Sequence, residues 1–476
     1  MVPITTAIRL LPSESVKNRY WSNLMVRVFQ VYYPKRTILL FSGEAVFFCA
    51  AFVLAVWLQR TPNFLTALMH QSAFVKILAV DAFALGFSYL LDLYEPQRLK
   101  SGRDMYCRLM LVLGVLSFVL SGVVLLVPRY LPGQNTSLIG MLILTVFLLG
   151  WRSLYEWLTN RPFFKERVCV IGGDRATRVA KALGERRDFG FEVVGFDSPS
   201  SDEQALALDV YSMAASHDIR RVIVAISERR GNLPIEQLLG LRLNGIQVEA
   251  DGAILERVLG KISTSELRPS DLIFSDGFRL NRLVLFLRRI LSILAAVILL
   301  IGVLPLIPVV ALAIKLSSPG PLLYSQKRVG YRGKIFYCYK FRTMRPDAEA
   351  DTGPTWASDT DPRITRIGRF LRATRIDEIP QLWNVLRGDM SFVGPRPERP
   401  EFVELLTREI PFYPLRHSIP PGITGWAQVR YKYGNSVADA QEKLNYDLYY
   451  IKNLSLGFDL TILLRTVKTI LRQHGV

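Results

Sequence analysis

The sequence predicts an α/β membrane protein with a four-helix transmembrane bundle, a Rossmann-like parallel α/β domain and a mainly helical C-terminal domain that carries a re-entrant membrane helix. Three observations predict this class. Half of the 476 residues are hydrophobic, and the mean hydropathy is positive at +0.23. The apolar residues are concentrated in a few long runs, as in integral membrane proteins. After the first four runs, short apolar strands alternate with helical segments, which is typical of a parallel sheet.

The chain is strongly basic, with a net charge of +18 from 59 Lys and Arg against 41 Asp and Glu. On a soluble chain such an excess would suggest nucleic acid, but no recognisable nucleic-acid motif accompanies it here. Cytoplasmic loops of membrane proteins collect Lys and Arg, and anionic lipids and phosphorylated substrates favour a basic surface. We therefore expect membrane lipid, and no nucleic acid, among the partners.

The four cysteines are scattered, with no C-x-x-C pair and no nearby cluster of histidines: Cys49, Cys107, Cys169 and Cys338. This spacing predicts neither a zinc site nor a disulfide framework.

Four apolar runs fill the N-terminal third of the chain, at residues 37–58, 74–93, 109–127 and 138–154. Each is close to the about 20 residues that a helix needs to cross a bilayer. Lys and Arg are frequent before the first run and between the second and third, and rare in the other two loops. By the positive-inside rule, the N-terminal segment and everything after the fourth run should be cytoplasmic. We assign residues 1–36 to a cytoplasmic segment and residues 37–158 to four transmembrane helices.

Residues 166–262 read as a Rossmann-like α/β domain, beginning with the strand "RVCVIGG" and followed by a linker at residues 263–285. The glycines Gly172 and Gly173 at the end of that strand suggest a dinucleotide site. However, the string is G-G-D-R-A-T rather than G-x-G-x-x-G, so a scaffolding or regulatory role remains the alternative.

A fifth apolar run, residues 290–314 in a membrane segment assigned to 286–316, is long enough to cross the membrane. Both flanks of the run are basic, with Arg288 and Arg289 directly before it, and Pro305 and Pro308 lie inside it, where proline kinks a helix. A re-entrant helix that enters and leaves on the cytoplasmic side satisfies both facts. The alternative, a kinked span, would place residues 317–476 outside the cell.

The remaining residues, 317–476, form the C-terminal domain. Its last helix, predicted at residues 454–473, has a leucine-rich face that suits either an interfacial helix lying on the membrane or packing against the core. Arginines also recur at every third position, at Arg363, Arg366, Arg369, Arg372 and Arg375. On a helix this spacing forms a slowly rotating stripe that suits lipid headgroups and phosphate oxygens. Arg375 is the strongest candidate, because two carboxylates follow it.

Asp377 and Glu378, in "RIDEIPQLW", have two readings. Apolar residues from Ile379 to Leu386 have helical spacing, so Asp377 is a good helix N-cap, worth about 1 kcal/mol. A carboxylate at a helix N-terminus is also held ionised by the helix dipole, which favours a nucleophile or metal ligand over a proton donor.

Three ordered motifs carry a resemblance to a known family: "SPGPLLYSQKRVGYRGKIFYCYKFRTM", "DPRITRIGRFLRATRIDEIPQLWNVLRGDMSFVGPRPERPEF" and "PGITGWAQV". The chain resembles the bacterial polyprenyl-phosphate sugar-1-phosphate transferases, the monotopic phosphoglycosyl transferases, in their long form. That form primes exopolysaccharide synthesis with undecaprenyl-phosphate glucose or galactose phosphotransferase activity. The resemblance covers nearly the whole chain and makes residues 317–476 the catalytic domain.

The resemblance implies a two-step transfer of hexose-1-phosphate from a UDP-sugar, expected to be UDP-glucose, to undecaprenyl phosphate, with release of UMP. Asp377 would be the nucleophile and a Mg²⁺ ligand, and Glu378 would assist the metal or deprotonate the acceptor. Lys340, Arg342 and Arg396 match the family's basic positions and are expected to bind substrate, together with Arg375. The family's helix break usually reads Ser-Pro, whereas here Leu304 precedes Pro305, so only the bend is expected. The implied location is the bacterial inner membrane, with the catalytic domain facing the cytoplasm.

Two other functions stay open. The D-x-D string from Asp359 to Asp361 is how many glycosyltransferases hold a divalent metal, and such an enzyme would release UDP. A non-enzymatic membrane sensor could use the Rossmann-like domain. The sequence does not indicate which sugar is transferred, and homo-oligomer formation is left open.

Overall fold

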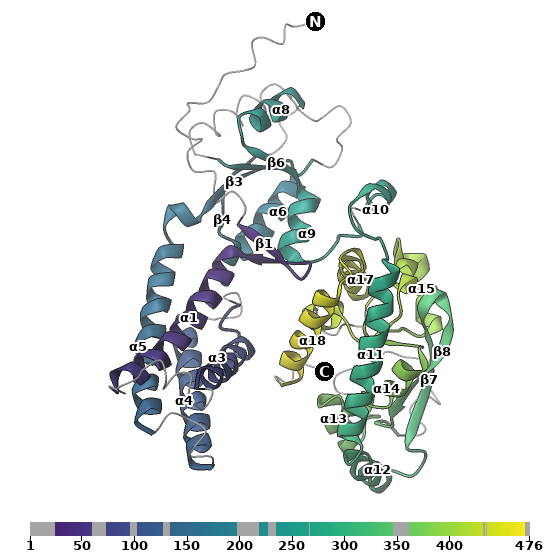
Figure 1. Cartoon of the computed structure of the whole chain (residues 1–476). Coiled ribbons are helices and arrows are strands. Elements are labelled where there is room, and N and C mark those ends of the chain that lie inside the picture. Colours follow the sequence, from purple (N-terminus) through teal and green to yellow (C-terminus); the bar gives the residue numbers. More distant parts are fainter. Residues whose placement is uncertain are drawn as a thin grey trace, which may run out of the picture. The chain divides into compact units, whose positions relative to one another are not determined.

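The computed structural model describes residues 24–59, 73–95, 102–126, 134–197, 219–226, 235–265, 267–345, 361–431, 434 and 436–471. They belong to two compact units (Figure 1). The first holds residues up to 254 except 28–31, and the second holds 28–31 and the residues from 255 onward. All four cysteines are free thiols; Cys169 and Cys338 are buried, and Cys107 is exposed.

The first unit contains a helical bundle of α1 (Lys35–Leu58), α3 (Ala73–Leu90), α4 (Gly102–Leu126) and α5 (Gln134–Thr159), preceded by the strands β1 (Met25–Val28) and β2 (Val31–Pro34). The bundle core is apolar, with Phe48, Leu116 and Leu144 among its buried side chains. Among the described residues, four helices are long and apolar enough to cross a membrane: Lys35–Leu58, Gly102–Val123, Thr136–Thr159 and Arg282–Val303. The predicted second crossing corresponds to α3, which packs between α1 and α4.

A buried polar network joins the ends of the bundle helices. Arg152 of α5 donates from Nε to Glu44 of α1 at 2.5 Å, and Tyr94, after α3, donates its hydroxyl to the same carboxylate at 2.6 Å. Arg152 also donates to the carbonyl of Leu93 at 3.1 Å. The ion-paired side chains are only 2% and 1% exposed. Since an unpaired charge in this position would be very costly, the network specifies how α1, α3 and α5 meet.

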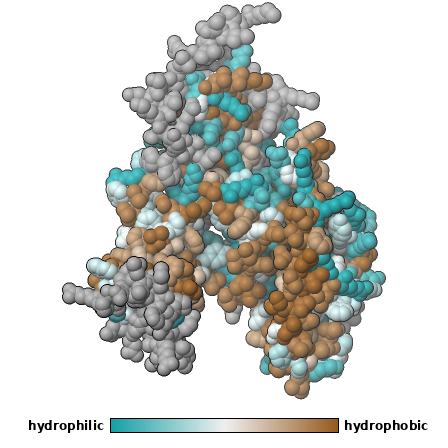
Figure 2. All heavy atoms as spheres, viewed as in Figure 1, coloured by the Kyte–Doolittle hydropathy of each residue, from teal (hydrophilic) through white to brown (hydrophobic). Residues whose placement is uncertain are grey.

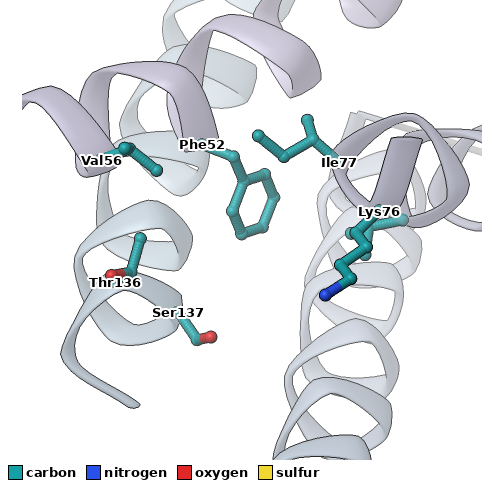
Figure 3. A pocket seen from close by; sticks show the side chains of 7 residues that line it. Phe52, Val56, Lys76, Ile77, Thr136 and Ser137 are labelled. Carbon is teal, nitrogen blue, oxygen red and sulfur yellow. The ribbon is translucent and has the colours of Figure 1, made fainter. Parts of the chain in front are cut away.

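A pocket opens between α1, α3 and α5 (Figure 3). Its walls are apolar side chains such as Phe52 and Ile77, and the Lys76 ammonium points toward the side on which Thr136 and Ser137 lie.

The parallel sheet of the first unit has the order β4-β3-β5-β6, with β3 (Glu166–Ile171), β4 (Phe191–Asp197), β5 (Arg221–Val224) and β6 (Gln247–Ala250). The helices α6 (Asp174–Glu185) and α9 (Asp251–Leu259) lie on the opposite face from α8 (Ile235–Leu243) (Figure 1). This confirms the predicted parallel α/β arrangement. Gly172, at the end of β3, has a φ of +138°, and a Cβ there would lie 2.5 Å from the Ala225 carbonyl. Close approach of two loops therefore explains this glycine without a nucleotide, and a nucleotide site remains a prediction.

The second unit includes α10 (Pro269–Phe274), α11 (Arg282–Val303) and α12 (Leu306–Ser317). The helix is interrupted at Leu304 and Pro305. Pro305 and Pro308 have no N–H to donate, and at the break the Leu304 N–H bonds to the Ile301 carbonyl and the Ile307 N–H bonds to the Leu304 carbonyl. Both halves pack on the rest of the second unit: α11 through Ala296 and α12 through Val310 and Ile314.

The remaining elements of the second unit pack against one side of this helix pair. They are the antiparallel hairpin β7 (Leu323–Val329) and β8 (Ile335–Phe341), the helices α13 (Arg366–Ala373) and α14 (Gln381–Arg387), the parallel pair β9 (Ser391–Val393) and β10 (Gly422–Thr424), and the helices α15 (Pro400–Glu409), α16 (Trp426–Arg430), α17 (Val437–Lys452) and α18 (Leu456–Leu471). Figure 2 shows that hydrophobic side chains cover the outward face of α11.

Helix α18 has two apolar faces. Phe458 and Ile462 are fully buried against the unit, whereas Leu460, Leu464, Val467 and Leu471 are exposed. One side of the helix therefore packs against the core, and the other side offers the apolar face that an interfacial helix needs. The location of this helix at the membrane surface remains a prediction.

The arginine stripe does not form one helix, contrary to the sequence prediction. Thr365 caps α13 by accepting from the Gly368 N–H at 2.9 Å, so Arg363 precedes the helix. Arg375 follows it in a left-handed conformation. Local capping therefore overrides the three-residue spacing, and only Arg366, Arg369 and Arg372 lie on α13.

Replacing Glu44 by Ala should lower the free energy of unfolding by about 3–5 kcal/mol, because Arg152 would stay buried without its counter-ion. Denaturant unfolding in mixed micelles, followed by circular dichroism, measures this change. The control Glu404→Ala removes an exposed pair with Arg408 and should cost under about 1 kcal/mol. The double replacement Glu44→Leu with Arg152→Met should recover most of the loss, and a double variant as unstable as the single one would refute the explanation.

Candidate active site

The two carboxylates lie in a short 3₁₀ turn, η8 (Ile376–Glu378), between α13 and α14. Arg375 enters the turn with a φ of +56°, which redirects the chain after α13. The prediction that Asp377 caps a helix is wrong. A cap residue has an extended backbone, whereas Asp377 is itself within a helical turn, and α14 begins only at Gln381 after Pro380. The helix dipole is therefore not what sets the charge of Asp377.

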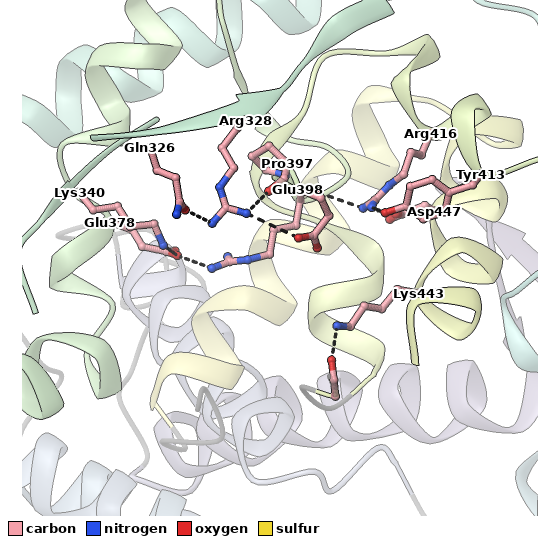
Figure 4. Close-up of polar contacts among 12 residues, drawn as sticks. Gln326, Arg328, Lys340, Glu378, Pro397, Glu398, Tyr413, Arg416, Lys443 and Asp447 are labelled. Carbon is pink, nitrogen blue, oxygen red and sulfur yellow. Dashed lines mark hydrogen bonds and ion pairs between the residues drawn. The ribbon is translucent and has the colours of Figure 1, made fainter. Parts of the chain in front are cut away.

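Glu378 is buried and has cationic partners from three segments, of which Figure 4 labels Lys340 beside it. Its Oε1 accepts from Lys340 Nζ of β8 at 3.0 Å and from Arg396, which follows β9, at 3.0 Å. Arg375 lies 3.5 Å from its other oxygen. Burial by itself raises the pKa of Glu378, but the charges of Lys340, Arg396 and Arg375 outweigh it and hold that pKa well below its usual range. Glu378 is thus a fixed negative charge that gathers three cations.

Asp377 is buried like its neighbour but lacks the partners that Glu378 has. Only 6% of it is exposed, and it has no hydrogen-bond or ion-pair partner among the residues that the structure describes. Burial raises its pKa, the charge of Lys340 opposes this, and the neighbouring Glu378 adds to it. An unpaired carboxylate beside a cluster of cations is a group available to a ligand.

Two arginines differ from the roles that the sequence predicted for them. Arg342 does not reach the dyad in this structure: it donates to the carbonyls of Ser318 at 2.7 Å and Pro319 at 3.1 Å, and so fixes the chain after α12. Its assignment to substrate binding stays a prediction that these contacts do not support. Arg372, which sequence reasoning did not single out, acts electrostatically on Asp377 and donates to Thr343 at 3.0 Å. The only feature of the sequence that pointed to Arg372 was its position in the arginine stripe.

The segment that carries Arg396 is held from two sides (Figure 4). On one side, Arg328 of β7 donates to the Pro397 carbonyl at 3.0 Å and pairs with Glu398 at 3.6 Å. On the other, Arg416 donates to the Arg396 carbonyl at 3.0 Å. Arg416 is in turn anchored by Asp447 at 2.9 Å and by the Tyr413 hydroxyl at 2.5 Å. No local pattern marks these residues, because they come from distant parts of the chain.

The D-x-D string receives little support as a metal site. Asp361 forms a bidentate pair with Arg363, at 2.8 and 2.6 Å, and hydrogen bonding from Arg363 lowers the pKa of its carboxyl. Asp359 lies outside the described residues. Among the described residues, no three or more His, Cys, Asp or Glu side chains gather to hold a metal. Mg²⁺ does not need such a cage, since it is commonly bound by one or two carboxylates together with substrate phosphates, and the unpaired Asp377 fits that role.

Replacing each carboxylate by its amide should change stability in opposite directions in metal-free buffer at pH 7. The raised pKa of Asp377 means that its protonated form favours the folded state and that this contribution is lost as pH rises through the folded pKa. Asp377→Asn should therefore stabilise the protein. The depressed pKa of Glu378 means that its charged form contributes stability, which is lost as pH falls below its ordinary value of about 4.5. Glu378→Gln should therefore destabilise it, and each change should be about 1–3 kcal/mol.

Thermal unfolding of the purified variants measures both changes. The exposed Glu409 supplies a matched control, since Glu409→Gln should stay within about 0.5 kcal/mol of the parent. Shifts of the same sign for Asp377→Asn and Glu378→Gln would contradict the assigned charge states.

Comparison with known proteins gives a consistent result. A family model described as bacterial sugar transferase matches residues 283–473. The chain is 44% identical over 222 residues to the UDP-N-acetylgalactosamine-undecaprenyl-phosphate N-acetylgalactosaminephosphotransferase of Aeromonas hydrophila, covering 47% of this chain and 52% of the relative. It is 35% identical over 311 residues to the undecaprenyl-phosphate glucose phosphotransferase of Komagataeibacter xylinus, covering 63% and 58%.

A third relative is matched over more of its length. The UDP-glucose:undecaprenyl-phosphate glucose-1-phosphate transferase of Escherichia coli (strain K12) is 43% identical over 332 residues, covering 65% of this chain and 69% of the relative. The chain thus spans little more than half of the first two relatives and about two thirds of the third. The match includes β7, β8 and the segments that bring Lys340, Glu378 and Arg396 together. The chain belongs to the bacterial sugar transferase family, the polyprenyl-phosphate sugar-1-phosphate transferases.

Proposed function

We propose that this protein transfers a hexose-1-phosphate from a UDP-sugar to undecaprenyl phosphate, which releases UMP and starts the assembly of an exopolysaccharide. The observation that carries the proposal is the contrast between the two buried carboxylates. Glu378 gathers three cations, and Asp377 beside it is left unpaired. This combination suits attack by a carboxylate on a phosphate that already carries negative charge.

The reaction proceeds in two steps on Asp377. A carboxylate oxygen of Asp377 attacks the β-phosphorus of the UDP-sugar, and the bond from that phosphorus to the bridging oxygen breaks, so UMP leaves with the oxygen. The sugar phosphate is then bound to Asp377 as a mixed anhydride. An oxygen of undecaprenyl phosphate attacks the same phosphorus, the bond to Asp377 breaks, and the carboxylate is restored with undecaprenyl-diphosphate-sugar as product.

The cations perform the electrostatic work of both steps. Lys340, Arg396 and Arg375 are held at Glu378, so their charges are already in place when negative charge develops on the leaving UMP. In this proposal the main role of Glu378 is to position these three cations. Its expected role in assisting the metal or deprotonating the acceptor is secondary. Mg²⁺, held by Asp377 and the donor's phosphates, would neutralise phosphate charge when bound.

The membrane arrangement supports the same activity. Both α11 and α12 pack against the rest of the second unit, and the flanking residues at both ends are basic. We propose that the two helices form a re-entrant pair that enters and leaves on the cytoplasmic side of the bacterial inner membrane. UDP-sugars are then accessible from the cytoplasm, and the phosphate of undecaprenyl phosphate can meet Asp377 at the bilayer surface.

Glucose is the first donor to test, because two of the three relatives described above are named for glucose. N-acetylgalactosamine is the alternative, from the Aeromonas relative. A glycosyltransferase that releases UDP is less well supported, since the Asp361 carboxylate is already paired with Arg363.

Asp377→Asn should reduce UMP release by at least about 10³-fold, because an amide is not a nucleophile towards phosphorus. The assay uses purified protein in lipid nanodiscs with UDP-glucose, undecaprenyl phosphate and Mg²⁺, and separates UMP from UDP by chromatography. Glu409→Gln, at an exposed position at the end of α15, should retain full activity. Release of UDP in place of UMP, or unchanged turnover by Asp377→Asn, would overturn the proposal.

The re-entrant helix predicts that the chain after α12 stays in the cytoplasm. In a variant without native cysteines, Lys327→Cys, at an exposed position on β7, should react with a membrane-impermeant maleimide only after the inner membrane is opened. Asn63→Cys, in the loop that the charge pattern places outside, should react in intact spheroplasts. Labelling of Lys327→Cys in intact spheroplasts would show a kinked span instead.

A further inference from the structure

One face of α11 differs from the rest of this helix. Arg288, Ser292 and Ala296 follow one another at intervals of four residues and are buried, whereas side chains such as Phe286, Leu294 and Ile298 are exposed. A helix apolar enough to lie in a membrane therefore turns an arginine and a serine toward the protein. Buried charges of this kind are expensive unless all their bonds are formed, so their partners identify what the helix holds.

Arg288 joins three elements of the catalytic domain. Its Nε donates to Asp459 of α18 at 2.6 Å, and Nη2 donates to the Tyr450 hydroxyl of α17 at 2.5 Å. Nη2 also donates to the carbonyl of Val393 at 2.9 Å. Val393 is the last residue of β9, and Arg396 follows three residues later. The guanidinium thus fixes the start of the segment that brings Arg396 to Glu378.

Arg289 holds the other side of the site. Its two terminal nitrogens donate to the carbonyls of Val385 and Leu386, the latter at 2.8 Å. These carbonyls lie in the last turn of α14, where a cation is also favoured by the helix dipole. Because α14 begins at Gln381, three residues after Glu378, this contact fixes the helix that continues from the dyad. Ser292 adds a link, since its hydroxyl lies 3.1 Å from that of Ser391 in β9.

We propose that Arg288 and Arg289 are positioning residues that tie the membrane helix α11 to the two segments carrying Arg396 and the Asp377–Glu378 dyad. They touch no reacting atom and act through Val393 and α14. The inference rests on the proposed function. The structure supplies its reason: two consecutive arginines of one helix bond to the backbone on both sides of the site, at carbonyls whose positions set the distance between Glu378 and Arg396.

Lysine is the informative replacement. In Arg288→Lys the charge beside Asp459 remains, but one ammonium on a flexible stem cannot reproduce the planar guanidinium that serves Asp459, Tyr450 and Val393 together. We expect kcat for UMP release to fall about 10- to 100-fold, with a change of less than about threefold in KM for the UDP-sugar, since misplacement of a positioned charge acts mainly on the transition state. Arg289→Lys should behave in the same way.

Arg282→Lys is the matched control, because Arg282 is an exposed arginine at the start of the same helix. It should leave kcat and KM unchanged. A double-mutant cycle then tests whether Arg288 acts through Arg396. The effect of Arg288→Lys should be much smaller when Arg396 is already lysine, whereas additive losses, or kinetics of Arg288→Lys equal to those of Arg282→Lys, would overturn the proposal.

A second measurement does not depend on activity. Hydrogen exchange in nanodiscs should be faster in Arg288→Lys than in Arg282→Lys at the amides of Ser391 and Gly394, which bond to Pro421 and Thr424. Arg289→Lys should speed exchange at Gly388, which closes α14. Unchanged exchange would overturn the positioning role. If the parent protein releases no UMP, the proposed function fails, and the exchange rates still decide whether these arginines hold the two segments.

Discussion

The second unit depends on one electrostatic constraint: the buried Glu378 carboxylate must be surrounded by Lys340, Arg375 and Arg396. A buried carboxylate without partners would be too costly to keep ionised, and three cations crowded together would repel one another. Together they are mutually stabilising, so the β8 strand, the 3₁₀ turn and the segment after β9 are held at one point. Asp377 shares the burial but has no hydrogen-bond or ion-pair partner among the described residues. The charges of Lys340, Arg372 and Arg396 still act on it and oppose the rise in its pKa that burial causes.

Further bonds keep the three segments in register. Asn384 of α14 is fully buried, and its side-chain amide accepts from the Tyr339 N–H at 3.1 Å and donates to the Tyr337 carbonyl at 2.7 Å. This side chain thus bonds to the free backbone edge of β8, where a third strand would otherwise pair. The strand that carries Lys340 is thereby fixed to the helix that follows the dyad. Arg328 and Arg416 do the same for the segment of Arg396. Since each bond is to a backbone carbonyl or amide, the geometry tolerates little change in these side chains.

Both units place ionic side chains where their apolar surroundings make them expensive. In the bundle, Glu44 and Arg152 are paired among lipid-compatible helices, and in the catalytic unit Arg288 faces inward from an apolar helix. In each case hydrophobic burial is non-directional, whereas the ion pair requires a particular rotation of the helix. The apolar residues bring the helices together, and the charged residues determine which faces meet.

The sequence by itself determined the features that rest on local periodicity and linear motifs: the apolar runs, the parallel α/β domain, the break near Pro305 and the dyad within its family motifs. Tertiary structure decided which charges meet. Two of the three partners of Glu378, Lys340 and Arg396, lie 38 and 18 residues away, so no window of sequence shows that Arg396 reaches the dyad while Arg342 bonds to the turn after α12. Arg288 and Arg289 were counted only as flanking positive charge, yet both are directed into the catalytic unit. The physical reason is that helical spacing reports which residues share a face, whereas the partner of a charged side chain depends on distances that only the packed chain creates.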